Sequence, residues 1–257
     1  MLVRADDAGS SWSSNIGCLR ACTEGIARSV EVMMPGAWIA HAAQLFNGES
    51  PIDIGIHLTL TSEWTSVKWR PLTCAPTLID QNGDFFPLLM PRTGDSRPNL
   101  LERKWSIDDI AKEFRAQIEL GLAAFPKATH ISSHMIRHFS DFDQRVGDVV
   151  SDLCNEFSLK DDLFGHGLPR FSGYPKIPRE AAHRVASFIE QLKDLEPGTY
   201  IFIDHPAVES SELRATGHPG YDDVFEDRTT CLETLINDAV KSHIVRVGID
   251  LISYGDL

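Results

Sequence analysis

Short runs of apolar and β-branched residues alternate along the chain with longer segments whose apolar residues recur every three or four positions. The short runs predict strands at residues 2–3, 30–34, 52–60, 130–133, 163–164, 200–204 and 244–247. The longer segments predict a helix from Ser13 or Ser14 to Ile26 and helices over residues 37–46, 106–125, 143–157, 179–195 and 227–242. This order of elements is typical of an α/β fold in which helices cover a parallel sheet.

Residues 61–105 interrupt this alternation after the third predicted strand. The segment has no helical or strand period and contains Pro71, Pro76, Pro87, Pro91 and Pro98 among several aromatic residues. A connection this long inside a compact domain is usually either functional or disordered. We expect residues 61–105 to be a lid or substrate-binding insertion, with a disordered surface loop as the alternative.

The number of strand and helix candidates favours a TIM-like (β/α) barrel of seven or eight units. No glycine-rich phosphate loop follows the first strand, which argues against an open dinucleotide-binding sheet. With 257 residues the chain has the length of one such barrel, so we expect residues 1–257 to form a single domain.

Composition limits the kind of partner. Hydrophobic residues make up 42% and charged residues 24% of the chain, which is ordinary for a globular protein and excludes global disorder. The formal net charge of -13 disfavours nucleic acid or an anionic membrane surface as a partner and suits a small neutral or cationic molecule.

Five scattered cysteines form no CxxC pair and are expected to be reduced. We also expect a cytoplasmic protein, because neither a basic-then-apolar leader nor a membrane-spanning apolar run is present.

Polar side chains end several predicted strands or lie within them. These are Asp6 and Asp7 after the first strand, His57 in the third, His134 after residues 130–133, and Asp204 and His205 at the end of residues 200–204. In a parallel barrel the carboxyl ends of all strands meet at one mouth. An Asp-Asp pair alone is a common turn signal, and a strand histidine is commonly a packed core residue. Their joint placement nevertheless predicts one site.

Two histidines and one carboxylate make a ligand set for a divalent ion that leaves positions open for water and substrate. Asp7, His57 and His134 supply that set. A bound ion acidifies water and polarises a carbonyl group, which are the two requirements for hydrolysing an amide. Asp6 is adjacent to a ligand and is the candidate general base.

Further polar residues have two explanations each. His205 precedes Pro206 and is either a general acid for the leaving amine or a hydrogen-bonded histidine at a strand end. His138 follows His134 by four residues, but in a loop, so we expect it in the pocket wall or in contact with substrate. Arg228, together with Glu233 on a predicted helix, is either a surface or interhelical pair or a substrate contact.

No serine-centred elbow, P-loop or dinucleotide fingerprint is present, which removes the main rival enzyme classes. The motifs that are present resemble those of the YdjC-like carbohydrate deacetylases, the family of chitooligosaccharide deacetylase and hopanoid-associated deacetylases. Residues 4–9 resemble its Asn-Ala-Asp-Asp-Phe-Gly opening, 55–61 its Gly-(Ile/Met)-His-x-x-Leu-Thr strand, and 132–138 its Asp-Ser-His-x-His-x-His segment. Residues 198–206 and 228–235 resemble a later strand ending in His-Pro-Gly and the helix that follows it.

The resemblance implies a seven- or eight-unit barrel and a divalent metal at Asp7, His57 and His134. It also implies removal of an N-acetyl group from an amino sugar or glycoconjugate, with Asp6 as the base, and a homodimer. The family metal has been taken as magnesium or zinc. Two imidazole ligands favour zinc or another transition metal on physical grounds.

The chain departs from the family motifs at Arg4, Ala8, Ser132 and Ile136, where the family has Asn, Phe, Asp and His. The missing carboxylate at Ser132 is expected to remove an orienting group for a metal ligand, and Ile136 to remove a polar group from the pocket. Two alternatives therefore remain. One is deacylation of a non-chitin secondary-metabolite amide, and the other is a catalytically silent sugar- or metal-binding protein.

Overall fold

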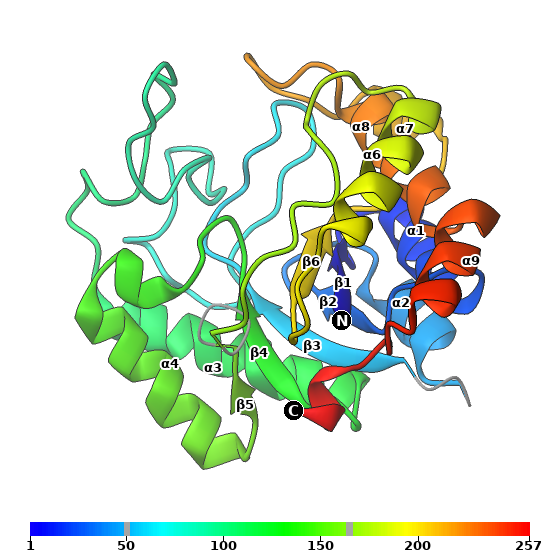
Figure 1. Ribbon diagram of the computed structural model, residues 1–257. Helices are drawn as coiled ribbons and strands as arrows, with labels where there is room; N and C mark the ends of the chain where they lie inside the picture. Colours follow the sequence, from blue (N-terminus) through cyan, green and yellow to red (C-terminus); the bar gives the residue numbers. More distant parts are fainter. Residues whose placement is uncertain (49–51, 163–166) are drawn as a thin grey trace.

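The computed structural model describes residues 1–48, 52–162 and 167–257. Its six strands form one parallel sheet in the order β5-β4-β3-β2-β1-β6, curved into a half-barrel (Figure 1). The strands are β1 (Leu2–Ala8), β2 (Ser29–Val32), β3 (Asp53–Leu58), β4 (His130–Ser133), β5 (Lys160–Asp161) and β6 (Ile201–Asp204). Every residue of β1 to β4 is buried, as expected for parallel strands covered on both faces.

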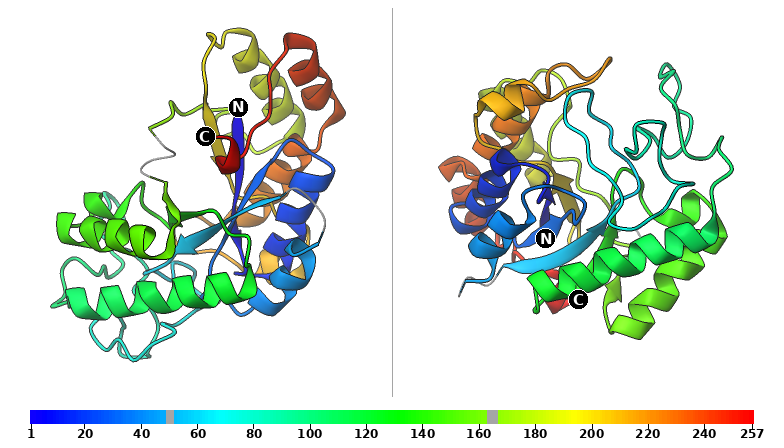
Figure 2. Two further views of the ribbon diagram at one scale, coloured as in Figure 1. Left: turned by 90° about the horizontal axis from the view of Figure 1, so that it is seen from below. Right: turned by 180° about the vertical axis from the view of Figure 1, so that it is seen from behind.

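Helices cover the sheet in two groups (Figures 1 and 2). Near β3 to β5 lie α3 (Ile107–Ala124), η1 (Phe139–Asp141) and α4 (Gln144–Phe157). The second group, which packs on the side of β1, contains α1 (Trp12–Thr23), α2 (Ile39–Phe46), α6 (Ala181–Lys193), α7 (Ser211–Arg214), α8 (Val224–Leu235) and α9 (Asp238–Val247). The short helix η2 (Tyr254–Asp256) ends the chain.

Helix boundaries follow from capping residues in the sequence. The side chains of Ser11, Ser106, Asp143 and Asn237 accept hydrogen bonds from backbone N–H groups in the first turns of α1, α3, α4 and α9. Gly248 ends α9 in the left-handed region with a φ of 72°.

The α/β class with a parallel sheet is confirmed, but the described residues do not form the expected barrel of seven or eight units. The predicted strand at residues 163–164 lies outside the described residues. On the free edge of β6, the N–H of Phe171 donates to the carbonyl of Ile201 at 2.9 Å, without a strand being formed there. The sheet is therefore open between β5 and β6 in the described part of the chain.

The predicted strand at residues 244–247 is wrong, because this segment is the last turn of α9. Val240, His243 and Ile244 are buried while Val245 is 79% exposed, which is a helical and not an alternating pattern. The predicted helix at 227–242 is likewise two helices, since Asn237 starts a new one. β-branched residues suggested a strand, but the cap and the buried face decided the structure.

The segment that follows α9 packs beneath the open side of the sheet. The N–H of Ile252 donates to the carbonyl of Met1 at 3.0 Å, and Lys160 Nζ donates to the carbonyl of Tyr254 at 2.6 Å. The hydroxyl of Tyr254 donates to Asp162 Oδ1 at 2.7 Å inside the fold. The end of the described chain thus bridges β1 and β5.

The insertion at residues 61–105 is packed against the fold and is not a loose surface loop. The carboxylate of Glu113 on α3 accepts hydrogen bonds from the N–H groups of Leu72 and Thr73, both at 3.0 Å. Trp64, Trp69, Leu78, Phe85 and Leu100 of the insertion are buried in the main hydrophobic core. Among the described residues, no helix combines the length and apolar character needed to cross a membrane.

Candidate metal centre

The backbone at Asp7 brings two neighbouring carboxylates to one site. Successive side chains of a strand normally point to opposite faces, so Asp6 and Asp7 would be separated in a regular strand. Asp7 instead has a φ of 70°, and the pairing register between β1 and β2 shifts between Ala5 and Ala8. As a result, Asp6 Oδ2 lies 3.7 Å and Asp7 Oδ1 lies 3.9 Å from the Nε2 atom of His57. A left-handed non-glycine residue costs about 1 kcal/mol, a cost common at functional sites.

Asp7, His57 and His134 converge from the ends of β1, β3 and β4. One donor atom from each lies within 4.8 Å of the other two, and all three residues are buried. His134 Nδ1 lies 3.3 Å from Asp7 Oδ1. The structure thus brings together the three residues that the sequence predicted as metal ligands.

The chemistry of these donors fits a divalent cation. Asp7 Oδ2 accepts a hydrogen bond from Arg228 Nη2 at 2.7 Å. The other oxygen, Asp7 Oδ1, is also buried but accepts no hydrogen bond from the described residues. A buried carboxylate oxygen without a donor is costly unless a cation completes it. The set can therefore hold a metal through Asp7 Oδ1, His57 Nε2 and His134 Nδ1.

Each histidine is oriented through its other ring nitrogen. His57 Nδ1 lies 2.7 Å from Ser132 Oγ, and the Ser132 hydroxyl in turn donates to Glu31 Oε2. His134 Nε2 lies 3.1 Å from Glu63 Oε2, on the first part of the insertion. Such contacts fix the orientation of a metal-ligating imidazole. The expectation that serine at position 132 removes the orienting group is therefore wrong, because Ser132 itself bonds His57.

The charges around the two histidines push their pKa values apart. Burial disfavours imidazolium at His134, but the carboxylates of Glu63 and Asp7 outweigh burial and raise its pKa to about 10. Burial, with the nearby charges of His134 and Arg4, lowers the pKa of His57 well below its usual value. In the absence of a metal, His134 is thus the protonated member of the pair.

Asp6 is held by a buried arginine. Arg4 Nε and Nη2 donate to the two carboxylate oxygens of Asp6 at 2.7 and 2.8 Å, while Arg4 Nη1 donates to Asp162 Oδ2 at 2.8 Å. Burial raises the pKa of Asp6, and the charge of Arg4 opposes that shift. The residue that replaces the family's asparagine is therefore in direct contact with the candidate base.

His205 lies at the same site and is open to solvent. Its Nε2 atom is 4.0 Å from Asp7 Oδ2, and its ring is 41% exposed. Burial of the surroundings disfavours its charged form, but Asp7 and the hydrogen bond to Asp204 outweigh this and raise its pKa. Asp204 also accepts a hydrogen bond from the Tyr174 hydroxyl. An accessible imidazole with a raised pKa beside the carboxylates suits a proton donor.

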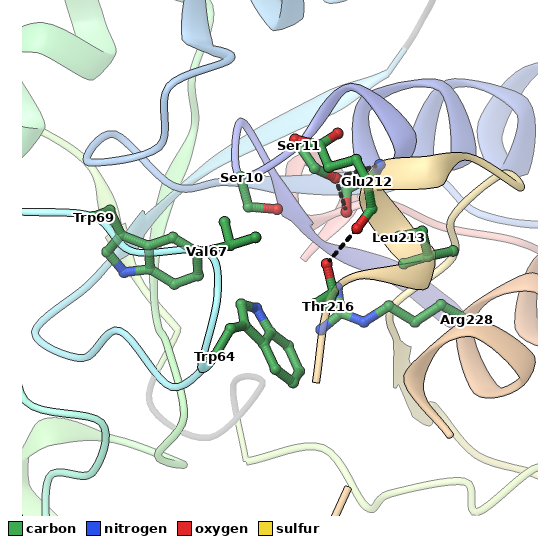
Figure 3. Close-up of a pocket in the computed structure, with 10 residues that line it drawn as sticks. Ser10, Ser11, Trp64, Val67, Trp69, Glu212, Leu213, Thr216 and Arg228 are labelled. Carbon is green, nitrogen blue, oxygen red and sulfur yellow. Dashed lines mark hydrogen bonds between the residues drawn. The ribbon is translucent and has the colours of Figure 1, made fainter. Parts of the chain in front are cut away.

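Arg228 does not form the expected surface or interhelical pair. Its guanidinium is buried, donates to Asp7 and lies 5.1 Å above the ring of Trp64, whereas Glu233 on the same helix is exposed. Arg228 also borders a narrow pocket between the insertion and α7, which is lined by Ser10, Ser11, Ser14, Trp64, Val67, Trp69, Glu212, Leu213 and Thr216 (Figure 3).

His138 lies apart from this group. Its Nε2 atom is 3.2 Å from Asp161 Oδ1 at the end of β5, and it lines a separate cavity of about 330 Å³ beside α4. The structure therefore gathers Asp6, Asp7, His57, His134, His205 and Arg228 in one place and leaves His138 beside β5.

Sequence reasoning missed Glu31 and Glu63. Glu31 lies inside an apolar strand, and Glu63 follows the third strand by five residues. A carboxylate within a run of buried residues indicates a buried polar partner, because a buried charge needs a hydrogen-bonding or oppositely charged group. Neither partner could be identified before the strands were placed side by side.

Comparison with known proteins identifies the same family as the sequence motifs at residues 4–9, 55–61 and 132–138. The family model described as YdjC-like protein matches residues 1–246. The chain belongs to the YdjC-like protein family. A Yersinia enterocolitica protein named chitooligosaccharide deacetylase is 28% identical, with 100% of this chain and 98% of that protein covered. A Clostridium beijerinckii protein named carbohydrate deacetylase is 29% identical, with 100% and 99% covered.

A solved structure shares the fold. The protein, from Enterococcus faecalis V583, is assigned provisionally to cellobiose-phosphate cleavage and superposes with a TM-score of 0.75. It is 20% identical, and the match covers 99% of this chain and 97% of that chain.

All five cysteines of the present chain are free thiols, as expected from their spacing.

Proposed function

We propose that this protein is a metal-dependent hydrolase that removes an N-acetyl or related N-acyl group from an amino sugar or glycoconjugate. The observation that carries this proposal is the buried Asp7, His57 and His134 group with an unsatisfied carboxylate oxygen. The names of the full-length relatives, chitooligosaccharide deacetylase and carbohydrate deacetylase, support the substrate class. Two imidazole donors favour zinc or another transition metal over magnesium.

The remaining residues of the site have roles in amide hydrolysis. A divalent cation bound at Asp7, His57 and His134 would polarise the amide carbonyl and acidify water. Asp6, held by Arg4, takes a proton from the attacking water molecule while the oxygen of that water bonds to the carbonyl carbon. His205 donates a proton to the amide nitrogen as the carbon–nitrogen bond breaks. The products are a carboxylate and a free amine.

The narrow pocket beside Arg228 supports a carbohydrate substrate. Its tryptophans and serines, drawn in Figure 3, combine apolar rings with hydrogen-bonding groups in the pocket lining. Its volume of about 10 Å³ is room for one water molecule. Admission of a sugar ring therefore requires Trp64, Val67 and Trp69 to shift. For this reason we propose that residues 61–105 act as a lid.

The test is metal content paired with acetate release from N-acetylated sugars in the presence of zinc, cobalt or magnesium. We expect about one transition-metal ion per chain, by analogy with mononuclear catalytic sites, and release that depends on it. Acetate should not appear from the metal-free protein. Bound metal with no release from a broad panel of acetylated sugars would redirect the search to other amides.

Site variants separate metal binding from catalysis. His57→Ala and His134→Ala should lose both metal and activity, because each removes a ligand. Asp6→Asn should keep the metal and lower turnover by about 100-fold or more, because it removes the general base. His243→Ala, which alters a buried histidine on α9, is the control and should keep both. Full metal occupancy in the two ligand variants would refute the assignment.

A further inference from the structure

A buried chain of hydrogen bonds links β2 to the candidate metal ligand His57. His57 Nδ1 lies 2.7 Å from Ser132 Oγ, and Ser132 Oγ donates to Glu31 Oε2. Glu31 Oε1 lies 2.8 Å from His130 Nε2 and accepts from Ser29 Oγ at 3.0 Å. None of these five residues is more than 2% exposed. The path from Glu31 to His57 is therefore shielded from water.

The register of three strands builds this path. Glu31 pairs with Gly55, Gly55 pairs with His130, and His57 pairs with Ser132 across neighbouring strands. Glu31 and His130 meet over Gly55, where a Cβ atom would come within 2.1 Å of Glu31 Oε2 and 2.4 Å of His130 Nε2. Glycine at position 55 thus leaves the space that the carboxylate occupies.

The directions of the hydrogen bonds determine the tautomer of His57. An ionised carboxylate only accepts, and a serine hydroxyl has a single proton to donate. Because Ser132 gives that proton to Glu31, its oxygen must accept a hydrogen bond from His57 Nδ1. The lone pair of His57 is then on Nε2, the atom that faces Asp6 and Asp7. This is the tautomer needed for coordination through Nε2.

We propose that Glu31 is a positioning residue for His57, acting through Ser132. Glu31 supplies from β2 the carboxylate whose loss at position 132 of β4 sets this chain apart from the family motif. The inference rests on the proposed metal site but not on the identity of the substrate. It predicts that the carboxylate can be moved from position 31 to position 132 with recovery of metal binding.

The first experiment reads the tautomer in the metal-free protein. Long-range ¹H–¹⁵N NMR of the histidine rings, assigned with His57→Gln, should show His57 protonated at Nδ1 and not at Nε2. Ser132→Ala should shift the ring toward a mixture of the two tautomers, whereas Ser29→Ala should not. Protonation of His57 at Nε2 in the unaltered protein would overturn the proposal, whatever the protein hydrolyses.

The second experiment measures zinc affinity by competition with a chelator. Glu31→Gln and Ser132→Ala should each weaken zinc binding by about 10- to 100-fold, the effect typical of residues that orient a ligand. Ser29→Ala, which removes a hydrogen bond to Glu31 outside the path, is the matched control and should stay within about threefold. Circular dichroism and thermal midpoints of the metal-free variants establish that each one is folded.

The decisive variant is the double substitution Glu31→Gln with Ser132→Asp. The introduced aspartate can accept from His57 directly, so zinc affinity should recover by about tenfold or more over Glu31→Gln alone. A folded double variant that binds no more tightly than Glu31→Gln overturns the proposal. The proposal is also overturned if neither Glu31→Gln nor Ser132→Ala changes the affinity for zinc. Zinc binding without acetate release would count against the deacetylase proposal only, because neither experiment measures turnover.

Discussion

The strained backbone at Asp7 sets the geometry of the candidate site at the scale of single residues. Its φ of 70° brings the side chains of two consecutive aspartates to the same place beside His57. Asp7 faces Arg228 and the histidines, while Asp6 is clamped by Arg4. The two carboxylates thereby acquire opposite pKa shifts, lowered for Asp7 and raised for Asp6. Such divergence between neighbouring groups is typical of carboxylates that have different roles at one site.

Arg4 tunes the candidate base, which gives a prediction for the pH–rate profile. Arg4→Asn removes a charge that lowers the pKa of Asp6, so that pKa should rise. The acidic limb of kcat/KM should then move to higher pH by about one unit or more. Arg4→Lys keeps the charge but not the two-pronged contact, and should move the limb less. An unmoved limb in Arg4→Asn would show that another group controls it.

The pKa of His134 predicts how metal affinity depends on pH. This pKa is about 10 in the metal-free site, and an imidazole must lose its extra proton before it can bind a metal ion. Each bound zinc ion therefore displaces a proton, and affinity should fall about tenfold for each pH unit below that pKa. Chelator competition across neutral pH measures the slope. Glu63→Gln removes a carboxylate that raises the pKa, so its slope should be shallower. A pH-independent affinity would contradict the assignment.

At the scale of elements, two carboxylates of α3 hold the backbone of the insertion at residues 61–105. Glu113 accepts from two backbone N–H groups, from the Thr73 hydroxyl and from Gln117, although it is completely buried. Asp109, one turn earlier, accepts from the N–H and hydroxyl of Thr77. Two carboxylates of one helix thus replace the hydrogen bonds that a regular element would have made.

Glu113→Ala should therefore loosen the insertion and destabilise the fold. The substitution leaves several partly buried donors without this acceptor, which costs about 1–3 kcal/mol in the free energy of unfolding. Urea denaturation measures this cost, and hydrogen exchange at Leu72 and Thr73 should accelerate. Glu119→Ala, on the exposed face of α3, is the control and should change stability little. Equal effects from the two variants would show that Glu113 does not anchor the insertion.

At the scale of the whole molecule, the end of the described chain supports the site from below the sheet. Tyr254 lies with its ring centroid 3.7 Å from that of His130, and its hydroxyl contacts both Asp162 and Arg4. Arg4 in turn holds Asp6. Residues near the two ends of the chain therefore share one buried network with the candidate base.

Tyr254→Phe should weaken this network without removing the ring contact. Loss of one buried hydroxyl that makes two hydrogen bonds should cost about 1–2 kcal/mol in unfolding free energy, measured by urea denaturation. Turnover should also fall, because Arg4 loses one of its fixed contacts. Tyr200→Phe is the control, since the Tyr200 hydroxyl forms no hydrogen bond with the described residues. A stability equal to that of the control would exclude a role for the Tyr254 hydroxyl.

The sequence by itself determined the α/β class, most helix positions and the three candidate metal ligands. Apolar periodicity and caps are local properties, and the ends of parallel strands meet at one edge whatever the exact curvature of the sheet. His57 and His134 could therefore be placed together from their positions on predicted strands. The same reasoning failed at residues 244–247, because β-branched residues also occur in helices when a cap and a buried face require it.

Only the tertiary structure decided which side chains surround those ligands. The pairing of Glu31 with Ser132, of Glu63 with His134 and of Arg228 with Asp7 joins residues far apart in sequence. Such contacts depend on strand register and on the backbone angle at a single residue, and a register shift of one position would turn each strand side chain to the other face. Strands that are buried on both faces have no apolar–polar alternation to indicate their register, so these partners could be identified only from the three-dimensional structure.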